Sequence, residues 1–224
     1  MLNEGGEPAD RPEKETSRTE AFSDGVFAIA ITLLVLELKV PRLEGVPEQA
    51  GLIRALAAQW PSYLAFLISF ITILIMWVNH HNLFTYIRRS DGLFMFLNGA
   101  VLLTVTVVPF PTALLAEYIR HPQASIAAAI YAGTFLCNCA AFAVMWRYAS
   151  KGKRLLDQRL DAGLIQGIKR QAMTGIVLYI LALGMAFVSV FVSVGMCLLL
   201  AVFFAVTGSM HHILAGRKKT VETK

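Results

Sequence analysis

Long apolar blocks alternate with short polar segments along this chain, and each block is long enough to form a membrane-spanning helix. The hydrocarbon core of a bilayer is about 30 Å thick, so a helix needs about 20 mostly apolar residues to cross it. Six blocks reach this length, and they predict helices at about 20–40, 60–82, 92–116, 122–148, 171–189 and 193–215. The predicted fold class is therefore an all-α membrane protein with six transmembrane helices per subunit.

Three details of these blocks refine the prediction. No Asp, Glu, Lys or Arg occurs in residues 172–216, a stretch too long for one crossing, so it must fold back as a hairpin, with the turn expected at Ser189–Gly195. Pro109 and Pro111 should kink the outer end of the third helix, because proline lacks a backbone N–H. Residues 46–59 carry apolar side chains at helical spacing, which indicates an interfacial helix on the outer side.

Basic residues divide the polar segments into two sets. If the N-terminus is cytoplasmic, so is every Lys and Arg except Lys39, Arg42, Arg54 and Arg120. Because basic residues are retained on the cytoplasmic side, both termini are predicted to be cytoplasmic. Residues 1–17, rich in Glu, Pro and Gly, should form a disordered tail, residues 18–216 the transmembrane domain, and residues 217–224 a basic tail. The net charge of +5 then reflects topology, so the expected partner is the lipid bilayer and not nucleic acid.

Only 16% of the residues are charged, and the ionisable groups of the spans gather at helix ends. These groups are Arg18, Asp24 and Glu37 in the first span, His80 and His81 in the second, and His211 and His212 in the sixth. A proton relay would need such groups throughout the membrane depth. Adjacent histidines point about 100° apart on a helix, unlike metal ligands one turn apart. An interfacial network that fixes helix register is favoured, and no metal site or cofactor is expected.

The first helix carries a narrow aliphatic seam. At about 100° per residue, Ile29, Leu33, Leu36 and Val40 fall within about 60° of one another, and Asp24 falls nearly opposite. The seam has two interpretations. It is either a stripe that faces lipid or another helix, or the lining of a pore that copies of this helix form around an axis. Periodicity alone does not choose between them.

A sequence motif at the start of the same helix points to a family. Arg18, Phe22, Ser23 and Asp24 form the pattern R-x-x-x-F-S-D, and the end of the second span reads Trp-Val-Asn-His-His-Asn from Trp77 onward. Both segments resemble the transmembrane protein 175 family of potassium channels. With one motif and six spans, the chain is similar to the single-repeat prokaryotic members.

The resemblance implies a potassium-selective channel without enzymatic activity, a multi-pass homotetramer of the bacterial inner membrane, with the first helices lining a central pore. Potassium in the pore is the only metal ion that it implies, and it implies no cofactor. The hydrophobic constriction, or gate, of the family maps onto Ile29, Leu33 and Leu36, with Thr32 in a hydroxyl layer that helps selectivity. Such side chains would stand in place of the carbonyl filter of other potassium channels.

The resemblance also suggests roles outside the constriction. Glu37, near the outer mouth, either raises the local cation concentration or pairs with Lys39 or Arg42. A polar network would hold the first helix against its own subunit by hydrogen bonds. Its expected members are Arg18, Phe22, Ser23, Asp24, Trp77, His80, His81 and Asn82.

Other classes of protein have six spans as well. A secondary transporter would show broken helices that meet at a midplane site, and only the region of Pro109 and Pro111 hints at one. An intramembrane enzyme is disfavoured by the scarcity of intramembrane acids and paired histidines. A non-conducting membrane scaffold is also consistent with the pattern.

Overall fold

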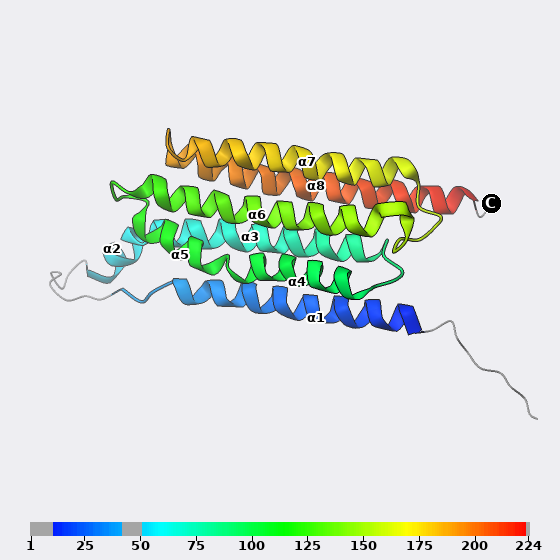
Figure 1. The fold of residues 1–224 in the computed structure, drawn as a ribbon. Helices are drawn as coiled ribbons and strands as arrows, with labels where there is room; N and C mark the ends of the chain where they lie inside the picture. The colour runs from blue at the N-terminus through cyan, green and yellow to red at the C-terminus, as the bar shows by residue number, and fades with distance from the viewer. Residues whose placement is uncertain (1–10, 42–50, 223–224) are drawn as a thin grey trace, which may run out of the picture.

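Long helices run side by side along one axis, with a short helix near one end of the bundle (Figure 1). The structure is a computed structural model that describes residues 11–41 and 51–222. The helices are α1 (Arg11–Leu33), continued by the 3-10 turn η1 (Leu34–Glu37), α2 (Gly51–Ala58), α3 (Trp60–Phe84), α4 (Gly92–Thr106), α5 (Pro109–Tyr118), α6 (Ala124–Ser150), the 3-10 turn η2 (Lys151–Lys153), α7 (Ala162–Met185) and α8 (Val190–Glu222).

Within the described residues, six helical segments are long and apolar enough to cross a bilayer, as the sequence predicts. These segments are Thr16–Glu37, Trp60–Phe84, Gly92–Tyr118, Ala124–Lys153, Ala162–Met185 and Val190–Gly208. The third segment is broken: α4 ends at Thr106 and α5 begins at Pro109, where the predicted kink lies. The expected helix in residues 46–59 corresponds to α2, while residues 46–50 lie outside the described part.

Several element boundaries differ from the prediction. Helix α1 begins at Arg11, so residues 11–17 are helical where a disordered tail was expected, and residues 1–10 lie outside the described part. Helix α7 begins at Ala162 and not at residue 171, because a helix can extend past the apolar segment that identifies it. Helix α8 continues to Glu222, through most of the predicted basic tail.

The turn between α7 and α8 was also placed wrongly. It occupies residues 186–189, and residues 190–195 belong to α8. The Ser189 hydroxyl accepts from the Val192 backbone N–H at 3.5 Å, so Ser189 occupies the N-cap position of α8. The Ser193 hydroxyl donates to the Ala182 carbonyl at 2.7 Å and ties the two helices together. Position 193 is therefore a helix–helix contact and not a loop.

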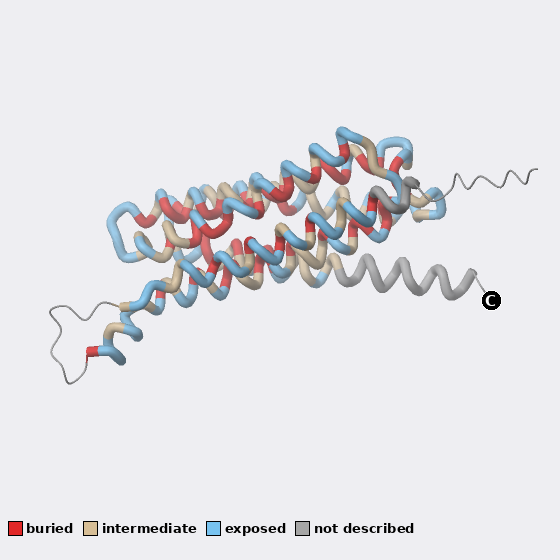
Figure 2. Tube along the Cα trace, turned by 90° about the horizontal axis from the view of Figure 1, so that it is seen from below, coloured by how far each residue is buried: buried red, intermediate tan, exposed pale blue. Residues whose placement is uncertain are grey.

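Buried residues follow the inward faces of the helices, and exposed residues follow the outer surface (Figure 2). Helix α6 contacts α4, α5, α7 and α8, so it holds the two sides of the bundle together. In this core the buried Ser69 hydroxyl lies within hydrogen-bond distance of two other hydroxyl groups. Ser69 of α3 lies 2.7 Å from the Thr112 hydroxyl of α5 and 3.1 Å from the Tyr131 hydroxyl of α6. Helix packing thus combines apolar burial with satisfied polar groups.

The α3–α4 and α6–α7 connections lie at the end of the bundle where α8 ends, and they are bonded to each other (Figure 1). The Arg88 backbone N–H, after α3, donates to the Leu155 carbonyl, after η2, at 2.9 Å. Asp91 accepts from the Tyr148 hydroxyl at 2.7 Å and from the Arg154 guanidinium at 2.8 Å. The α3–α4 and α6–α7 connections are therefore joined by backbone and charged contacts.

Asp91 also caps α4, and this gives a prediction for stability. Its Oδ1 accepts from the Phe94 backbone N–H at 2.9 Å. Partial burial acts to raise the pKa of Asp91, but these N–H, hydroxyl and guanidinium donors outweigh burial and hold the pKa below its ordinary value of 3.8. Asp91→Ala should cost about 1 kcal/mol at neutral pH, because the cap acceptor is lost. Thermal unfolding of the purified protein measures this cost.

The pH dependence of that cost follows from the sign of the pKa shift. A lowered folded-state pKa contributes stability above pH 3.8, and this stability is lost as the pH falls through the folded-state value. The gap between wild type and Asp91→Ala should therefore shrink in acid. Asp91→Asn is the matched control, because it keeps a cap acceptor and removes only the charge. An equal gap at neutral pH and well below pH 3.8 would contradict the charged role of Asp91.

Candidate functional site

Helix α1 buries one face against its own subunit and leaves the aliphatic seam outside. Ile29 is 58% exposed, Leu33 41% and Leu36 70%, whereas Phe27 is 1% exposed and Ala30 0%. These exposures match the helical wheel, on which the seam lies away from the packed face. Bulky aliphatic side chains in this position are available to lipid or to another copy of the chain, and they are not part of the subunit core.

Two polar residues lie near the seam. Thr32 is exposed, and its hydroxyl donates to the Ile29 carbonyl of the same helix at 2.9 Å. Glu37 is partly exposed, and its carboxylate has no hydrogen bond or ion pair within residues 11–41 and 51–222. Lys39, which was considered as its partner, instead approaches Glu117 at 3.9 Å. Arg42, the other partner considered, lies outside the described residues.

A buried chain of hydrogen bonds joins α1 to α3 and α4. The Asn98 amide of α4 donates from Nδ2 to Ser23 Oγ of α1 at 2.9 Å. Its Oδ1 lies 2.8 Å from His80 Nε2 of α3. Ser23 and His80 are fully buried, and Asn98 is 2% exposed. Three helices therefore share one polar connection in an otherwise apolar region.

The direction of each bond in this chain follows from the donors present. The Ser23 hydroxyl donates its only hydrogen to the Thr19 carbonyl at 2.8 Å, so its oxygen can only accept from Asn98. The Asn98 oxygen then faces His80, which must carry its hydrogen on Nε2. His80 Nδ1 is buried without a hydrogen-bond partner among the described residues. The His80 ring packs against the Phe84 ring, with the two ring centroids 4.6 Å apart.

Two further contacts attach the same half of α1 to α3. The Trp77 indole Nε1–H donates to Asp24 Oδ1 at 2.8 Å. Glu20 Oε1 lies 2.9 Å from His81 Nδ1, and the His81 ring stacks on Trp77 with centroids 6.1 Å apart. Together with the Ser23–Asn98–His80 chain, these contacts fix which face of α1 is turned to the subunit. We call this set of contacts the α1 anchor.

The α1 anchor differs from the predicted network at several residues. Arg18 lines a groove between α1 and α4, and its side chain forms no hydrogen bond or ion pair with the described residues. Phe22 is 67% exposed, and Asn82 faces a cavity on the other side of α3. The side chains of the two histidines of α8 lie outside the described part. Sequence reasoning missed Asn98, although a lone amide inside an apolar span was a usable signal.

The hydrogen bonds of the Asn98 amide should contribute measurably to the free energy of unfolding. Asn98→Leu keeps the volume but leaves the His80 Nε2–H and the Ser23 oxygen buried without partners, which should cost about 2 kcal/mol. The midpoint of thermal unfolding in detergent reports this loss. Asn82→Leu is the matched control, because the Asn82 side chain forms no hydrogen bond with the described residues. Equal stability of the Asn98 variant and wild type would show that the chain of hydrogen bonds contributes nothing.

Comparison with known proteins places this architecture in a family. The family model described as endosomal/lysosomal potassium channel TMEM175 matches residues 18–109. The chain is 53% identical over 193 residues to a potassium channel of Chamaesiphon minutus, covering 86% of this chain and 95% of that protein. The chain belongs to the TMEM175 family. The motif at Arg18–Asp24 lies within the residues that the family model matches, and the expectation of this family is confirmed.

Further proteins that are similar to this chain are also channels. The chain is 47% identical to a potassium channel of Streptomyces collinus, covering 85% of this chain and 91% of that one. It is 37% identical to the human endosomal/lysosomal proton channel TMEM175 over 111 residues, only 22% of that protein. The crystal structure of a lysosomal potassium-selective channel TMEM175 homolog from Chamaesiphon minutus superposes with a TM-score of 0.79 at 50% identity, covering 87% of this chain and 98% of that chain. These relatives are channels, so the chain is a multi-pass membrane protein of a channel family and not an enzyme.

Proposed function

We propose that this chain forms a potassium-selective channel in which the α1 helices of four copies line a central pore. The observation that carries the proposal is the exposed seam of Ile29, Leu33 and Leu36 on a helix whose opposite face is packed and polar-anchored. The bacterial relatives that share about half of its residues are named potassium channels.

The seam would act as a hydrophobic constriction in place of a carbonyl filter. Rings of Ile29, Leu33 and Leu36 around an axis form a neck that excludes water when it is narrow, so a cation must shed part of its hydration to pass. Potassium gives up water more readily than sodium. Thr32 hydroxyls beside Ile29 would replace part of the lost hydration and favour potassium modestly.

The surrounding residues have supporting roles in this proposal. The α1 anchor fixes the rotation of α1, so Asp24, Trp77 and His80 are positioning residues and not ion ligands. Glu37, at the other end of the spanning segment, would raise the cation concentration near the outer mouth. Its carboxylate is suited to this role because it is partly exposed.

The orientation in the membrane is part of the proposal. The α3–α4 and α6–α7 connections lie at the same end of the bundle, with the start of α1 and the end of α8 (Figure 1). These connections carry Arg88, Arg89, Lys153 and Arg154. Because basic residues stay on the cytoplasmic side, this end would be cytoplasmic in a bacterial inner membrane.

Single-channel recording tests the proposed function. Purified protein in a planar bilayer with a potassium gradient should give step-like currents that reverse near the potassium equilibrium potential. Steady flux without steps would identify a secondary transporter, and no flux would identify a scaffold. Steps that reverse at the same potential when sodium replaces potassium would contradict selectivity.

A further inference from the structure

Two basic residues of α7 lie at the level where the apolar part of the bundle ends. The Gln171 amide of α7 donates to the Thr207 hydroxyl of α8. Thr207 is one residue from the end of the apolar segment Val190–Gly208. Lys169 and Arg170 directly precede Gln171. These two residues therefore lie at the boundary between the hydrocarbon core and the headgroups of the bilayer.

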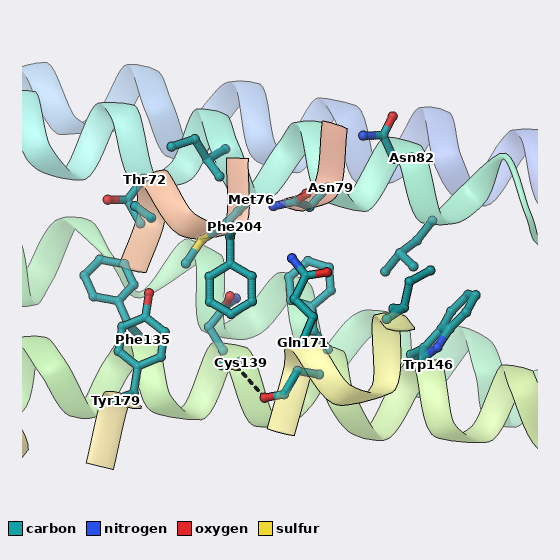
Figure 3. Close-up of a pocket in the computed structure, with 18 of the residues that line it drawn as sticks. Thr72, Met76, Asn79, Asn82, Phe135, Cys139, Trp146, Gln171, Tyr179 and Phe204 are labelled. Atoms are coloured by element: carbon teal, nitrogen blue, oxygen red, sulfur yellow. Dashed lines mark hydrogen bonds between the residues drawn. The ribbon is translucent and has the colours of Figure 1, made fainter. Parts of the chain in front are cut away.

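Arg170 points away from the interior of the bundle. Gln171 and Tyr179 line the cavity between α3, α6, α7 and α8 (Figure 3). The Cys139 thiol of α6 donates to the Ala172 carbonyl in the same part of α7, at 3.6 Å. Nine residues at about 100° each place Arg170 opposite Tyr179 on the helix. Arg170 is exposed, as this position requires.

An exposed apolar stripe runs along α7 from Arg170 into the hydrocarbon core. Met173 is 59% exposed, Val177 55% and Leu181 54%. At about 100° per residue, all three lie within about 60° of Arg170 on the helix. The distance from Arg170 to Leu181 is about 16 Å along the helix, close to half of the 30 Å hydrocarbon core. We call Met173, Val177 and Leu181 the α7 stripe, and it matches the depth of one lipid leaflet.

The two basic side chains have no counter-ion in the part of the chain that the structure describes. Neither Lys169 nor Arg170 forms a hydrogen bond or an ion pair there. By contrast, Arg154 at the same end of the bundle pairs with Asp91 at 2.8 Å. Asp161, at the start of α7, lies about 12 Å along the helix from Lys169. Charge complementarity therefore favours a negatively charged group at Lys169 and Arg170.

A free hydroxyl group lies one turn deeper on the same face of α7. Thr174 is exposed, and its hydroxyl forms no hydrogen bond with the described residues. A hydroxyl that faces hydrocarbon without a partner costs free energy. In a bilayer, the ester carbonyls of a glycerophospholipid lie just below its phosphate, so one of them can accept from Thr174 when the phosphate is at Arg170.

We propose that α7 binds an anionic glycerophospholipid, with the phosphate at Lys169 and Arg170 and one acyl chain along the α7 stripe. Thr174 donates to an ester carbonyl of the same lipid. Helix α7 lies on the opposite side of the bundle from α1 (Figure 1). In a tetramer with α1 at its axis this face is peripheral and contacts the bilayer. The proposal goes beyond ion conduction and does not depend on it.

Native mass spectrometry of the purified full chain in detergent tests the site. The probes are dioleoylphosphatidylglycerol, which is anionic, and dioleoylphosphatidylcholine, which has the same acyl chains and no net charge. The first lipid bound per subunit should be phosphatidylglycerol, with about 25-fold higher affinity, because each basic residue near a negative headgroup contributes about fivefold. Lys169→Gln combined with Arg170→Gln should abolish this preference.

Three further variants control this result. Lys151→Gln with Arg159→Gln removes two charges from exposed side chains that form no hydrogen bonds with described residues, and it should keep the preference. Lys169→Arg with Arg170→Lys keeps both charges and should bind as wild type does. Thr174→Val should weaken the binding of both lipids about fivefold, because both have ester carbonyls. Thermal unfolding without added lipid confirms that each variant is folded.

The same titrations can overturn the proposal. Equal affinity of wild type for the two lipids would contradict an anionic site. An equal loss of preference in the Lys151 and Arg159 double variant would mean that the total charge, and not this site, attracts the lipid. Displacement of the lipid by sn-glycerol 3-phosphate at equal affinity would show a site for free phosphate esters. Absence of potassium currents would refute the proposed channel and leave these affinities unchanged, so the two failures are distinguishable.

Discussion

Ile29→Asn should raise the potassium flux of the reconstituted protein by about tenfold and reduce its preference for potassium over sodium. Ile29 is 58% exposed in the seam, so in four copies around an axis the substitution would replace an apolar ring with a ring of amides. Amides hydrate the neck and lower the cost of bringing a cation into it. A fall of about 1.4 kcal/mol in this barrier is enough for a tenfold increase. Potassium and sodium flux into liposomes measure both effects.

A matched substitution separates a pore effect from a general effect of an amide in the membrane. Ile180 lies within α7 and is 51% exposed, so Ile180→Asn makes the same chemical change at similar exposure on another helix. We expect its flux and selectivity to equal those of wild type. If the two variants behave alike, or if Ile29→Asn leaves flux unchanged, the constriction does not lie at Ile29.

The six spans were predictable because the thickness of the bilayer sets the length of every membrane-spanning helix. An apolar block can be measured against the bilayer, so all six crossings follow from composition. The break at Pro109 follows equally well, because proline cannot donate in the helix. The helical wheel also places Ile29, Leu33 and Leu36 on the face that the structure leaves exposed. That this face lines a pore stays a prediction.

Features that depend on packing between helices were not predictable from the pattern. Residues 186–189 are as apolar as their neighbours, so nothing in the hydropathy marks the turn before α8. Asn98 interrupts an apolar span, but its partners Ser23 and His80 are set by three helices meeting. The cavity between α3, α6, α7 and α8 likewise arises where four helices meet.

Removing the hydrogen bond between Asp24 and Trp77 should strongly lower the open probability of the proposed channel. Asp24→Ala removes the acceptor of the Trp77 indole N–H, a charge-assisted hydrogen bond of 2.8 Å between α1 and α3. Such bonds contribute about 2 kcal/mol. If the bond holds α1 in its conducting position, its loss should lower the open probability by up to about thirtyfold. Single-channel recording reports the open probability, and size-exclusion chromatography reports assembly.

The same variant distinguishes an anchoring role from an ion-binding role. Asp24 faces its own subunit, so the reversal potential of the remaining openings should equal that of wild type. Trp77→Phe should reproduce the loss, and the double variant should cost little more than either single one, because both remove the same bond. Asp24→Asn keeps an acceptor and should recover part of the activity. Tetramers of Asp24→Ala with normal currents would refute the anchoring role, and an altered reversal potential would place the carboxylate in the ion path.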